Sequence, residues 1–176
     1  MIKNILSLPV MSMFLMACSA IKQAKYEKKN ARAELMTTNK NVIGEVKFKE
    51  TGKGVQVVAE FSGLQPGSVH GFHIHENSKC EGPDFKSAGG HFNPKGRPHA
   101  GPGAHQHHLG DFGNIVANEK GIAKKELLIK NREINGLEVV MNKAVILHQN
   151  PDDLVSQPSG NSGDRLACGL IQTAKK

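Results

Sequence analysis

Short apolar runs separated by turn-forming residues make up most of this chain. Between residues 55 and 61 every second side chain is apolar, a period near two that directs one face of a strand inward. Residues 52–54 and 119–121 fit hairpin turns, because glycine tolerates positive φ angles there. Six segments have the length and composition of strands: 42–49, 54–61, 69–75, 113–118, 122–129 and 137–148. The pattern predicts an all-β sandwich or barrel.

Length and composition agree with a single β domain. A chain of 176 residues can bury a substantial core, and its 19 glycines, single tyrosine and lack of tryptophan fit strands joined by turns. Two stretches, 76–112 and 149–165, are too long for hairpin turns. Because long ordered loops commonly carry function, we expect the functional residues there.

The first 17 residues differ in character from the rest. Lys3 gives a positive start, residues 5–16 are largely apolar but too short to span a bilayer, and Leu15-Met16-Ala17-Cys18 follows. These four residues resemble a bacterial lipobox, in which the cysteine becomes the lipidated first residue. We therefore predict a lipoprotein-type signal peptide over 1–17, an export route, and a location in the cell envelope or periplasm with a membrane anchor on Cys18. Ordinary cleavage and an uncleaved anchor are the alternatives.

Residues 18–40 are rich in Lys, Ala and Asn and lack alternation, which predicts a flexible tether before a domain at 41–176. A short amphipathic helix is the alternative. The formal net charge is +7, but part of it sits in this segment, where lysines suit anionic lipid headgroups: Lys22, Lys25, Lys28, Lys29 and Lys40. Nucleic acid is a poor partner for an exported chain with few aromatic residues.

Histidines are concentrated in the long loop and the strands beside it. His73 and His75 are two apart in a strand candidate, so both side chains leave the same face. His148 ends another apolar strand and can add a third imidazole, although a histidine that merely ends a strand is the structural alternative. Neutral imidazoles and carboxylates are ligands for copper and zinc, so the pattern indicates a metal centre.

The cysteines divide between the leader and the domain. With Cys18 assigned to lipidation, Cys80 and Cys168 remain as an even pair in an oxidising setting, and a disulfide is the simplest interpretation. Two unpaired buried thiols are the alternative. The closed loop would span most of the domain and contribute on the order of 4 kcal/mol in the chain-entropy model.

Four segments together resemble the copper,zinc superoxide dismutase family, in its order and spacing over about residues 41–173. They are Gly-Phe-His-Ile-His-Glu at 71–76, His-Phe-Asn-Pro at 91–94, His-Leu-Gly-Asp-Phe-Gly-Asn at 108–114 and Gly-Asp-Arg-Leu-Ala-Cys-Gly at 163–169. The resemblance implies a Greek-key β-barrel, related to the immunoglobulin-like sandwiches, with long metal-binding and active-site loops.

The resemblance also implies one copper and one zinc per subunit. The copper ligands of the family fall on His73, His75, His91 and His148. Its zinc ligands fall on His91, His99, His108 and Asp111, so that His91 bridges the metals. Asp152 matches a carboxylate that orients one ligand of each metal, with Asp153 as a near substitute. The remaining histidines of these segments are expected to be solvated or to support the ligands from outside: His70, His105 and His107.

By the same resemblance the protein is an oxidoreductase that dismutates superoxide to dioxygen and hydrogen peroxide and protects the cell envelope. Copper changes oxidation state, zinc does not, and His91 is both ligand and proton source. Arg165 matches the arginine that docks the anion through a permanently charged planar fork. A copper and zinc buffer or copper carrier is the alternative, and a blue-copper protein a weaker one. Arg165 favours the enzyme, because storage has no use for an anion-docking group.

Two features stay open at the level of sequence. Residues 150–164 contain no lysine, which puts substrate steering by that loop in doubt. A monomer and a homodimer are both compatible with the chain.

Overall fold

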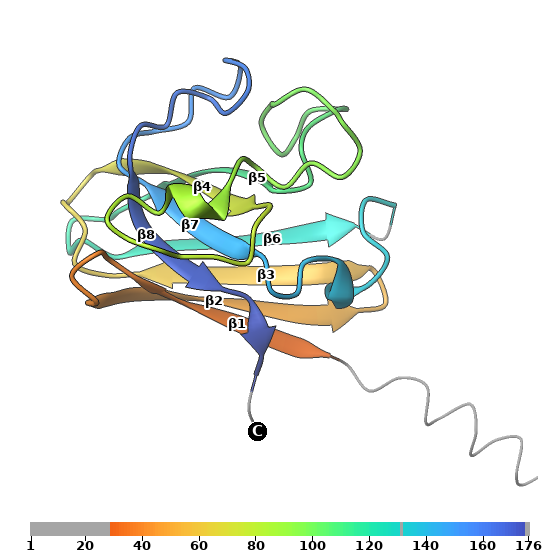
Figure 1. The fold of residues 1–176 in the computed structure, drawn as a ribbon, viewed down its shortest axis with the longest axis horizontal. Helices are drawn as coiled ribbons and strands as arrows, with labels where there is room; N and C mark the ends of the chain where they lie inside the picture. The colour runs from red at the N-terminus through yellow and green to blue at the C-terminus, as the bar shows by residue number, and fades with distance from the viewer. Residues whose placement is uncertain (1–28, 131, 175–176) are drawn as a thin grey trace, which may run out of the picture.

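The computed structural model describes residues 29–130 and 132–174. The predicted leader, Cys18 and the first part of the predicted tether lie outside these residues. Within the described residues, nine strands and two short 3-10 helices make up the regular structure (Figure 1). The strands are β1 (Asn30–Met36), β2 (Val42–Thr51), β3 (Gly54–Phe61), β4 (Val69–His75), β5 (Asp111–Val116), β6 (Ala123–Lys130), β7 (Ala144–His148), β8 (Arg165–Leu170) and β9 (Gln172–Thr173). The 3-10 helices are η2 (Lys86–Ala88) and η3 (Leu137–Val139).

The strands form one antiparallel sheet in the order β5-β4-β7-β8-β1-β2-β3-β6, with β9 added beside β1. The chain crosses from β3 to β4, from β5 to β6 and from β6 to β7 between non-neighbouring strands, which makes a Greek key. The two end strands approach each other, and the Lys125 ammonium on β6 donates to the Asn114 carbonyl on β5 at 2.6 Å. The sheet is therefore a nearly closed barrel, and the all-β Greek-key prediction is confirmed.

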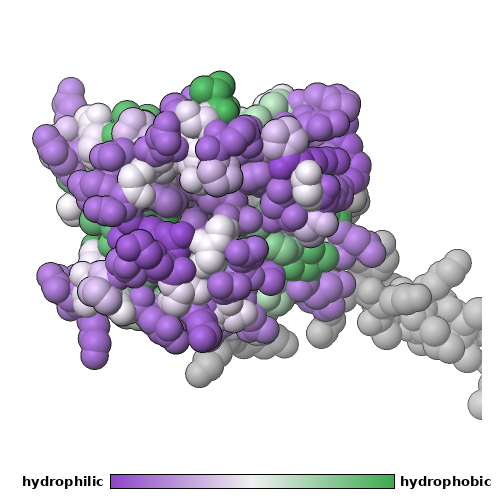
Figure 2. Space-filling view, turned by 45° about the horizontal axis from the view of Figure 1, so that its top comes forward, coloured by the Kyte–Doolittle hydropathy of each residue, from purple (hydrophilic) through white to green (hydrophobic). Residues whose placement is uncertain are grey.

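The barrel interior is filled by the inward faces of these strands. In β3 the predicted alternation is observed, with Val55, Val57, Ala59 and Phe61 buried. Phe72 lies between Phe61 and Phe112, with ring centroids 5.7 and 5.3 Å away. On the face drawn in Figure 2, hydrophobic side chains form small separate patches among hydrophilic ones. Within the described residues no helix is long and apolar enough to cross a membrane.

The prediction of a flexible tether over residues 18–40 is wrong for residues 30–36. These residues form β1, which pairs with β2 and shows strict alternation of buried and exposed side chains. Its inward residues are Ala31, Ala33 and Leu35. Two alanines give a weak hydrophobic signal, so the strand is specified by its neighbours more than by its own sequence.

Other strand boundaries also differ from the predicted ones. Of the predicted strand at 137–148 only Ala144–His148 is extended, because the preceding residues form the 3-10 helix η3. β5 begins at Asp111, two residues before the predicted start, and β8 and β9 were not predicted. The predicted hairpin turn at 52–54 joins the paired strands β2 and β3, with Gly54 at positive φ. The chain also turns at 119–121, with Gly121 at positive φ, but this turn joins β5 to β6, which are not neighbours in the strand order, so the prediction of a hairpin is wrong there.

Two long loops are held against each other and against the barrel. Residues 76–110 connect β4 to β5, and residues 149–164 connect β7 to β8 (Figure 1). They meet where the His99 amide donates to Gln157 Oε1 at 2.8 Å and Gln157 Nε2 donates back to the His99 carbonyl at 2.8 Å. The predicted Cys80–Cys168 disulfide is formed, with a Cα–Cα distance of 5.6 Å, and ties the first loop to β8.

A substitution in β1 tests whether this segment belongs to the folded barrel. Leu35 is fully buried, so Leu35→Ala is expected to lower the free energy of unfolding by about 2–5 kcal/mol in urea denaturation. Glu34→Ala, on the exposed face of the same strand, is the matched control and should change it by less than about 0.5 kcal/mol. Equal, negligible effects of both substitutions would mean that residues 30–36 behave as a tether.

Candidate metal centre

Two groups of buried ligand side chains lie side by side between the barrel and the long loops. In the first, His73 and His75 come from β4, His148 from the end of β7 and His91 from the loop. Because β4 and β7 are antiparallel neighbours, the two histidines of β4 and the one of β7 converge on one point. One nitrogen from each of the four rings lies within 4.8 Å of all the others.

The second group is built from the loop and the start of β5. One ligand atom from each of its members lies within 4.8 Å of the others: His91, His99, His108 and Asp111. Asp111 Oδ1 lies 2.8 Å from His91 Nδ1, 3.1 Å from His99 Nδ1 and 3.4 Å from His108 Nδ1. His91 belongs to both groups, since its two ring nitrogens point to opposite sides.

Several of these nitrogens are buried without a hydrogen-bond partner. In the described part of the chain six buried side-chain nitrogen or oxygen atoms lack one, and four belong to the two groups: His73 Nδ1, His91 Nε2, His99 Nδ1 and His108 Nδ1. A buried polar atom without a partner costs free energy, so such a concentration calls for an additional binding partner. Metal ions satisfy imidazole lone pairs of this kind, and the donor sets suit copper and zinc.

The opposite nitrogens of these rings are fixed by the protein. His75 Nδ1–H donates to the Gly89 carbonyl at 2.9 Å, and His148 Nδ1 faces the Gly163 carbonyl at 3.3 Å. Asp152 receives His73 Nε2 on one carboxylate oxygen at 2.7 Å and His99 Nε2 on the other at 3.0 Å. These contacts leave His73 Nδ1, His75 Nε2 and His148 Nε2 for binding, the arrangement expected of metal-ligating histidines.

Burial and charge set the protonation of the groups. Burial lowers the pKa of His73 to about 4, although its hydrogen bond to the Asp152 carboxylate opposes this shift, and burial lowers the pKa of His148 to about 3. Burial likewise holds the pKa of His75 well below its usual value. These rings are neutral at pH 7 and keep the lone pairs that a metal needs.

In the second group, neighbouring charges outweigh the effect of burial on the pKa values. Burial alone would lower the pKa of His99, but the adjacent Asp111 and Asp152 carboxylates outweigh it and raise that pKa to about 9. Burial would raise the pKa of Asp111, yet the adjacent His91 and His99 rings hold it well below its usual range. The pKa of Asp152 is lowered in the same way by His73 and His99. Ionised carboxylates here favour a bound cation.

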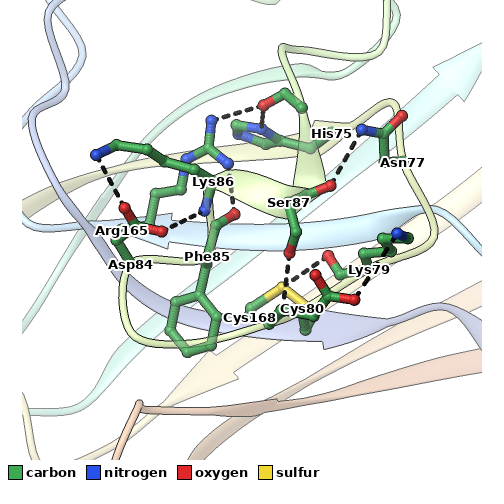
Figure 3. The surroundings of a disulfide bond; sticks show 12 residues. His75, Asn77, Lys79, Cys80, Asp84, Phe85, Lys86, Ser87, Arg165 and Cys168 are labelled. Atoms are coloured by element: carbon green, nitrogen blue, oxygen red, sulfur yellow. Dashed lines mark hydrogen bonds and ion pairs between the residues drawn. A yellow bond between two sulfur atoms is a disulfide. The ribbon is translucent and has the colours of Figure 1, made fainter.

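Arg165, at the start of β8, lies beside the first group. Its guanidinium donates to the Phe85 carbonyl and to the Gly89 carbonyl, both at 2.6 Å (Figure 3). Because Gly89 also accepts from His75, the loop carbonyl links the arginine to a member of the histidine cluster. The half-buried guanidinium is thereby held in one orientation. Its remaining N–H donors do not contact these two carbonyls.

The remaining predicted residues are placed as follows. His70 is buried, with Nδ1–H donating to the His148 carbonyl at 2.7 Å and Nε2 2.7 Å from Ser68 Oγ, so it supports a cluster residue from outside. His105 is exposed and His107 partly exposed. Asp153 is on the surface and caps the amides of Val155 and Ser156, whereas Asp152 makes the imidazole contacts.

Sequence reasoning missed two supports of the centre. Asn114 holds Asp152 in place, since Asn114 Nδ2 donates to the Asp152 carbonyl at 2.8 Å and the Asp152 amide donates to Asn114 Oδ1 at 2.7 Å. Phe85 supplies one of the arginine's two carbonyls. Backbone carbonyls carry no signal in sequence, and Asn114 reads as an ordinary strand residue.

A Greek-key barrel whose loops bring a four-imidazole group and a three-imidazole, one-carboxylate group together through a shared histidine defines a two-metal β-barrel protein. Residues 42–171 match the copper/zinc superoxide dismutase (SODC) profile, and the chain belongs to that family. Superoxide dismutase [Cu-Zn] 2 of Aquifex aeolicus (strain VF5) is 41% identical over 147 residues, which cover 81% of this chain and 86% of the relative. Superoxide dismutase [Cu-Zn] 3 of Arabidopsis thaliana is 40% identical over 152 residues, covering 81% and 90%.

Solved structures agree on the fold. The clock protein EA4 superposes with a TM-score of 0.72 at 32% identity, covering 85% of this chain and 97% of its own. A double mutant of a SOD-like protein from Bacillus subtilis superposes with a TM-score of 0.69 at 33% identity, covering 79% and 95%. Membership of the family confirms the prediction of an oxidoreductase that acts on superoxide and uses copper and zinc.

Asp152 provides a test of how the two groups are oriented. Asp152→Asn removes the negative charge and replaces one of the two acceptor oxygens by an amide NH2, so that only one of the two rings keeps its acceptor. The substitution is therefore expected to weaken the binding of both copper and zinc by about 10- to 100-fold. Asp153→Asn changes the same charge on the adjacent surface residue and is the control. Chelator competition on both variants measures the affinities, and an effect confined to one metal would contradict a shared orienting role.

Proposed function

We propose that this chain dismutates superoxide at the cell envelope, with copper held by His73, His75, His91 and His148 and zinc held by His91, His99, His108 and Asp111. The observation that carries the assignment is the pair of buried groups joined by His91, whose Nδ1 faces Asp111 while Nε2 is without a partner on the other side. Only an imidazole can offer one nitrogen to each of two ions.

The overall reaction consumes two superoxide anions and two protons and yields one dioxygen and one hydrogen peroxide. When bound, copper supplies the one-electron couple for both halves of the reaction, and zinc supplies a fixed charge without redox change. The protein has to provide an anion site, a dry and rigid ligand shell and a proton.

Arg165 is the proposed anion site. Its charge is permanent, its plane is fixed by the carbonyls of Phe85 and Gly89, and it is adjacent to His75 through Gly89. A planar fork with remaining donors can hold a small oxygen anion against the copper position. A copper carrier or buffer needs no such group, so the fixed arginine favours the enzyme over that alternative.

His91 is the proposed proton carrier. Its Nδ1 faces Asp111 Oδ1 at 2.8 Å, and zinc held by these two residues would keep the ring in place on that side. Nε2 would then be able to exchange copper for a proton without the ring turning away. A proton taken up at Nε2 is then positioned to pass to the reduced oxygen species docked at Arg165. The buried surroundings of the ring exclude competing bulk water.

Metal analysis of two single variants tests the ligand assignment. His91→Ala removes a ligand from both sites, so it should lose activity and weaken retention of zinc as well as copper. His148→Ala should lose copper and keep zinc. Equal loss of zinc in the two variants would contradict the assignment.

Arg165 tests the enzyme against the carrier. In Arg165→Ile both metals should remain bound, while the rate of superoxide removal should fall at least about 10-fold, equivalent to roughly 1.4 kcal/mol. Arg165→Lys should recover part of the rate, because it keeps the charge and loses the fork. Arg32→Ile, on the exposed face of β1, removes the same charge elsewhere and should leave the rate nearly unchanged. Full activity of Arg165→Ile at full copper occupancy would favour the carrier.

The envelope location rests on the sequence before the barrel. Because Leu15-Met16-Ala17-Cys18 resembles a lipobox, we propose that Cys18 carries the lipid that anchors the enzyme to the membrane. The wild type should partition into a detergent phase, whereas Cys18→Ser should be soluble or remain unprocessed. Ser19→Ala is the matched control and should behave like the wild type. A mature N-terminus without acyl groups, found by mass spectrometry, would overturn the anchor.

A further inference from the structure

Two histidines near the surface lie beside the proposed zinc site and take no part in it. His105 is exposed and His107 is partly exposed, and they are separated only by Gln106. Both line a surface pocket of about 220 Å³ between the loop and β6. The same pocket is lined by Asp111, the carboxylate of the proposed zinc site, so the two imidazoles and that carboxylate share one cavity.

The ring of His107 is oriented by a contact with a residue of the proposed zinc site. Its Nδ1 lies 2.6 Å from the His108 carbonyl, which can only accept, so Nδ1–H is the donor. This contact leaves Nε2 as the other ring nitrogen. A histidine that donates one N–H to a backbone carbonyl and offers the other nitrogen is oriented as metal ligands usually are.

The charges lining the pocket do not by themselves attract a cation. Lys130 and Arg132 contribute two positive charges, and Asp111 and Glu133 contribute two negative ones. Glu133 is already paired with Arg97 at 2.7 Å and with Lys95 and Arg132 at 3.5 Å, and Asp111 belongs to the proposed zinc site. Binding of a divalent ion would therefore depend on the imidazoles.

The proposed zinc ligands themselves are closed off from solvent. His99, His108 and Asp111 are each no more than 5% exposed, and of these three only Asp111 borders the surface pocket, so an incoming ion has little direct approach to the two imidazoles. An outer pair of imidazoles would hold a zinc ion next to this site until the loop opens. Local enrichment of a ligand beside its site raises association rates.

We infer that His105 and His107 form a weak, exposed Zn²⁺-binding site that captures zinc and passes it to the buried group. The inference rests on the proposed zinc site and adds a loading step to it. Two imidazoles completed by water bind more weakly than the buried set of three imidazoles and a carboxylate, which gives the ion a direction of transfer. No covalent or redox change is involved.

Zinc binding to the fully metal-loaded enzyme tests the outer site directly. In equilibrium dialysis with excess Zn²⁺, the wild type should bind one further zinc, and the His105→Ala/His107→Ala double variant should not. Gln106→Ala alters the exposed residue between them and should behave like the wild type. Extra zinc bound equally by the double variant would overturn the inference.

Uptake by the metal-free protein tests the loading step. With a chromophoric zinc indicator as donor, the double variant should fill its zinc site about 10-fold more slowly than the wild type, within the range of rate gains from local enrichment, and reach the same final content. His105→Ala alone leaves the contact between His107 and His108 intact and should also slow uptake. Unchanged rates would overturn the loading role.

A further variant, His108→Ala, distinguishes failure of the outer site from failure of the proposed zinc site. His108→Ala should lose tightly bound zinc altogether. If it keeps that zinc, the proposed site is wrong, whereas a normal His108→Ala result with wild-type uptake in the double variant overturns the outer site alone.

Discussion

The carboxylate of Asp152 is the contact on which the geometry of the centre depends. It receives His73 from β4 and His99 from the long loop on its two oxygens, and it is itself fixed through its backbone by Asn114 on β5. Gly160 is required beside it, since its φ is +67° and a Cβ there would collide with Asp152 Oδ1. One buried anion thus sets the orientation of both ligand groups, and its charge is retained because the two imidazoles stabilise it more than burial opposes it.

The position of the arginine depends on a second, covalent constraint. The disulfide joins Cys80 in the loop to Cys168 on β8, three residues after Arg165, and Phe85 packs with Cys168 in a small buried cluster (Figure 3). Phe85 has a φ of +56°, a left-handed conformation that costs a bulky residue on the order of 1 kcal/mol or more. The Lys86 amide donates a hydrogen bond to the Asp84 carboxylate at 3.0 Å. This bond joins the residues on either side of Phe85 and so supports the turn. This conformation aims the Phe85 carbonyl at the guanidinium.

The sequence was sufficient to predict the barrel class from its alternation and, through the resemblance to the family, to predict which side chains lie together in the two groups. Strands such as Gly54–Phe61 alternate clearly, and the ligand histidines are fixed in spacing by strand pairing, as with His73 and His75 opposite β7. β1 could not be predicted, because Ala31 and Ala33 bury little surface and the strand is specified by its pairing with β2, β8 and β9. The carbonyls of Phe85 and Gly89 and the supporting amide of Asn114 arise from loop geometry that residue types do not encode.

The barrel alone does not determine what such a chain does. A protein named as a clock protein superposes on this one with a TM-score of 0.72, so the same strands serve proteins of different description. What distinguishes a dismutase is the set of donors that the barrel carries: unpartnered imidazole nitrogens on a rigid shell and a guanidinium held beside them. In this chain the loop at residues 149–164 contributes Asp152 and Asp153 but no lysine, so Arg165 itself carries the positive charge fixed against the histidine cluster. The proposed selectivity for a small anion therefore rests on a single side chain, whose two carbonyl partners lie in the loop that the disulfide ties to β8.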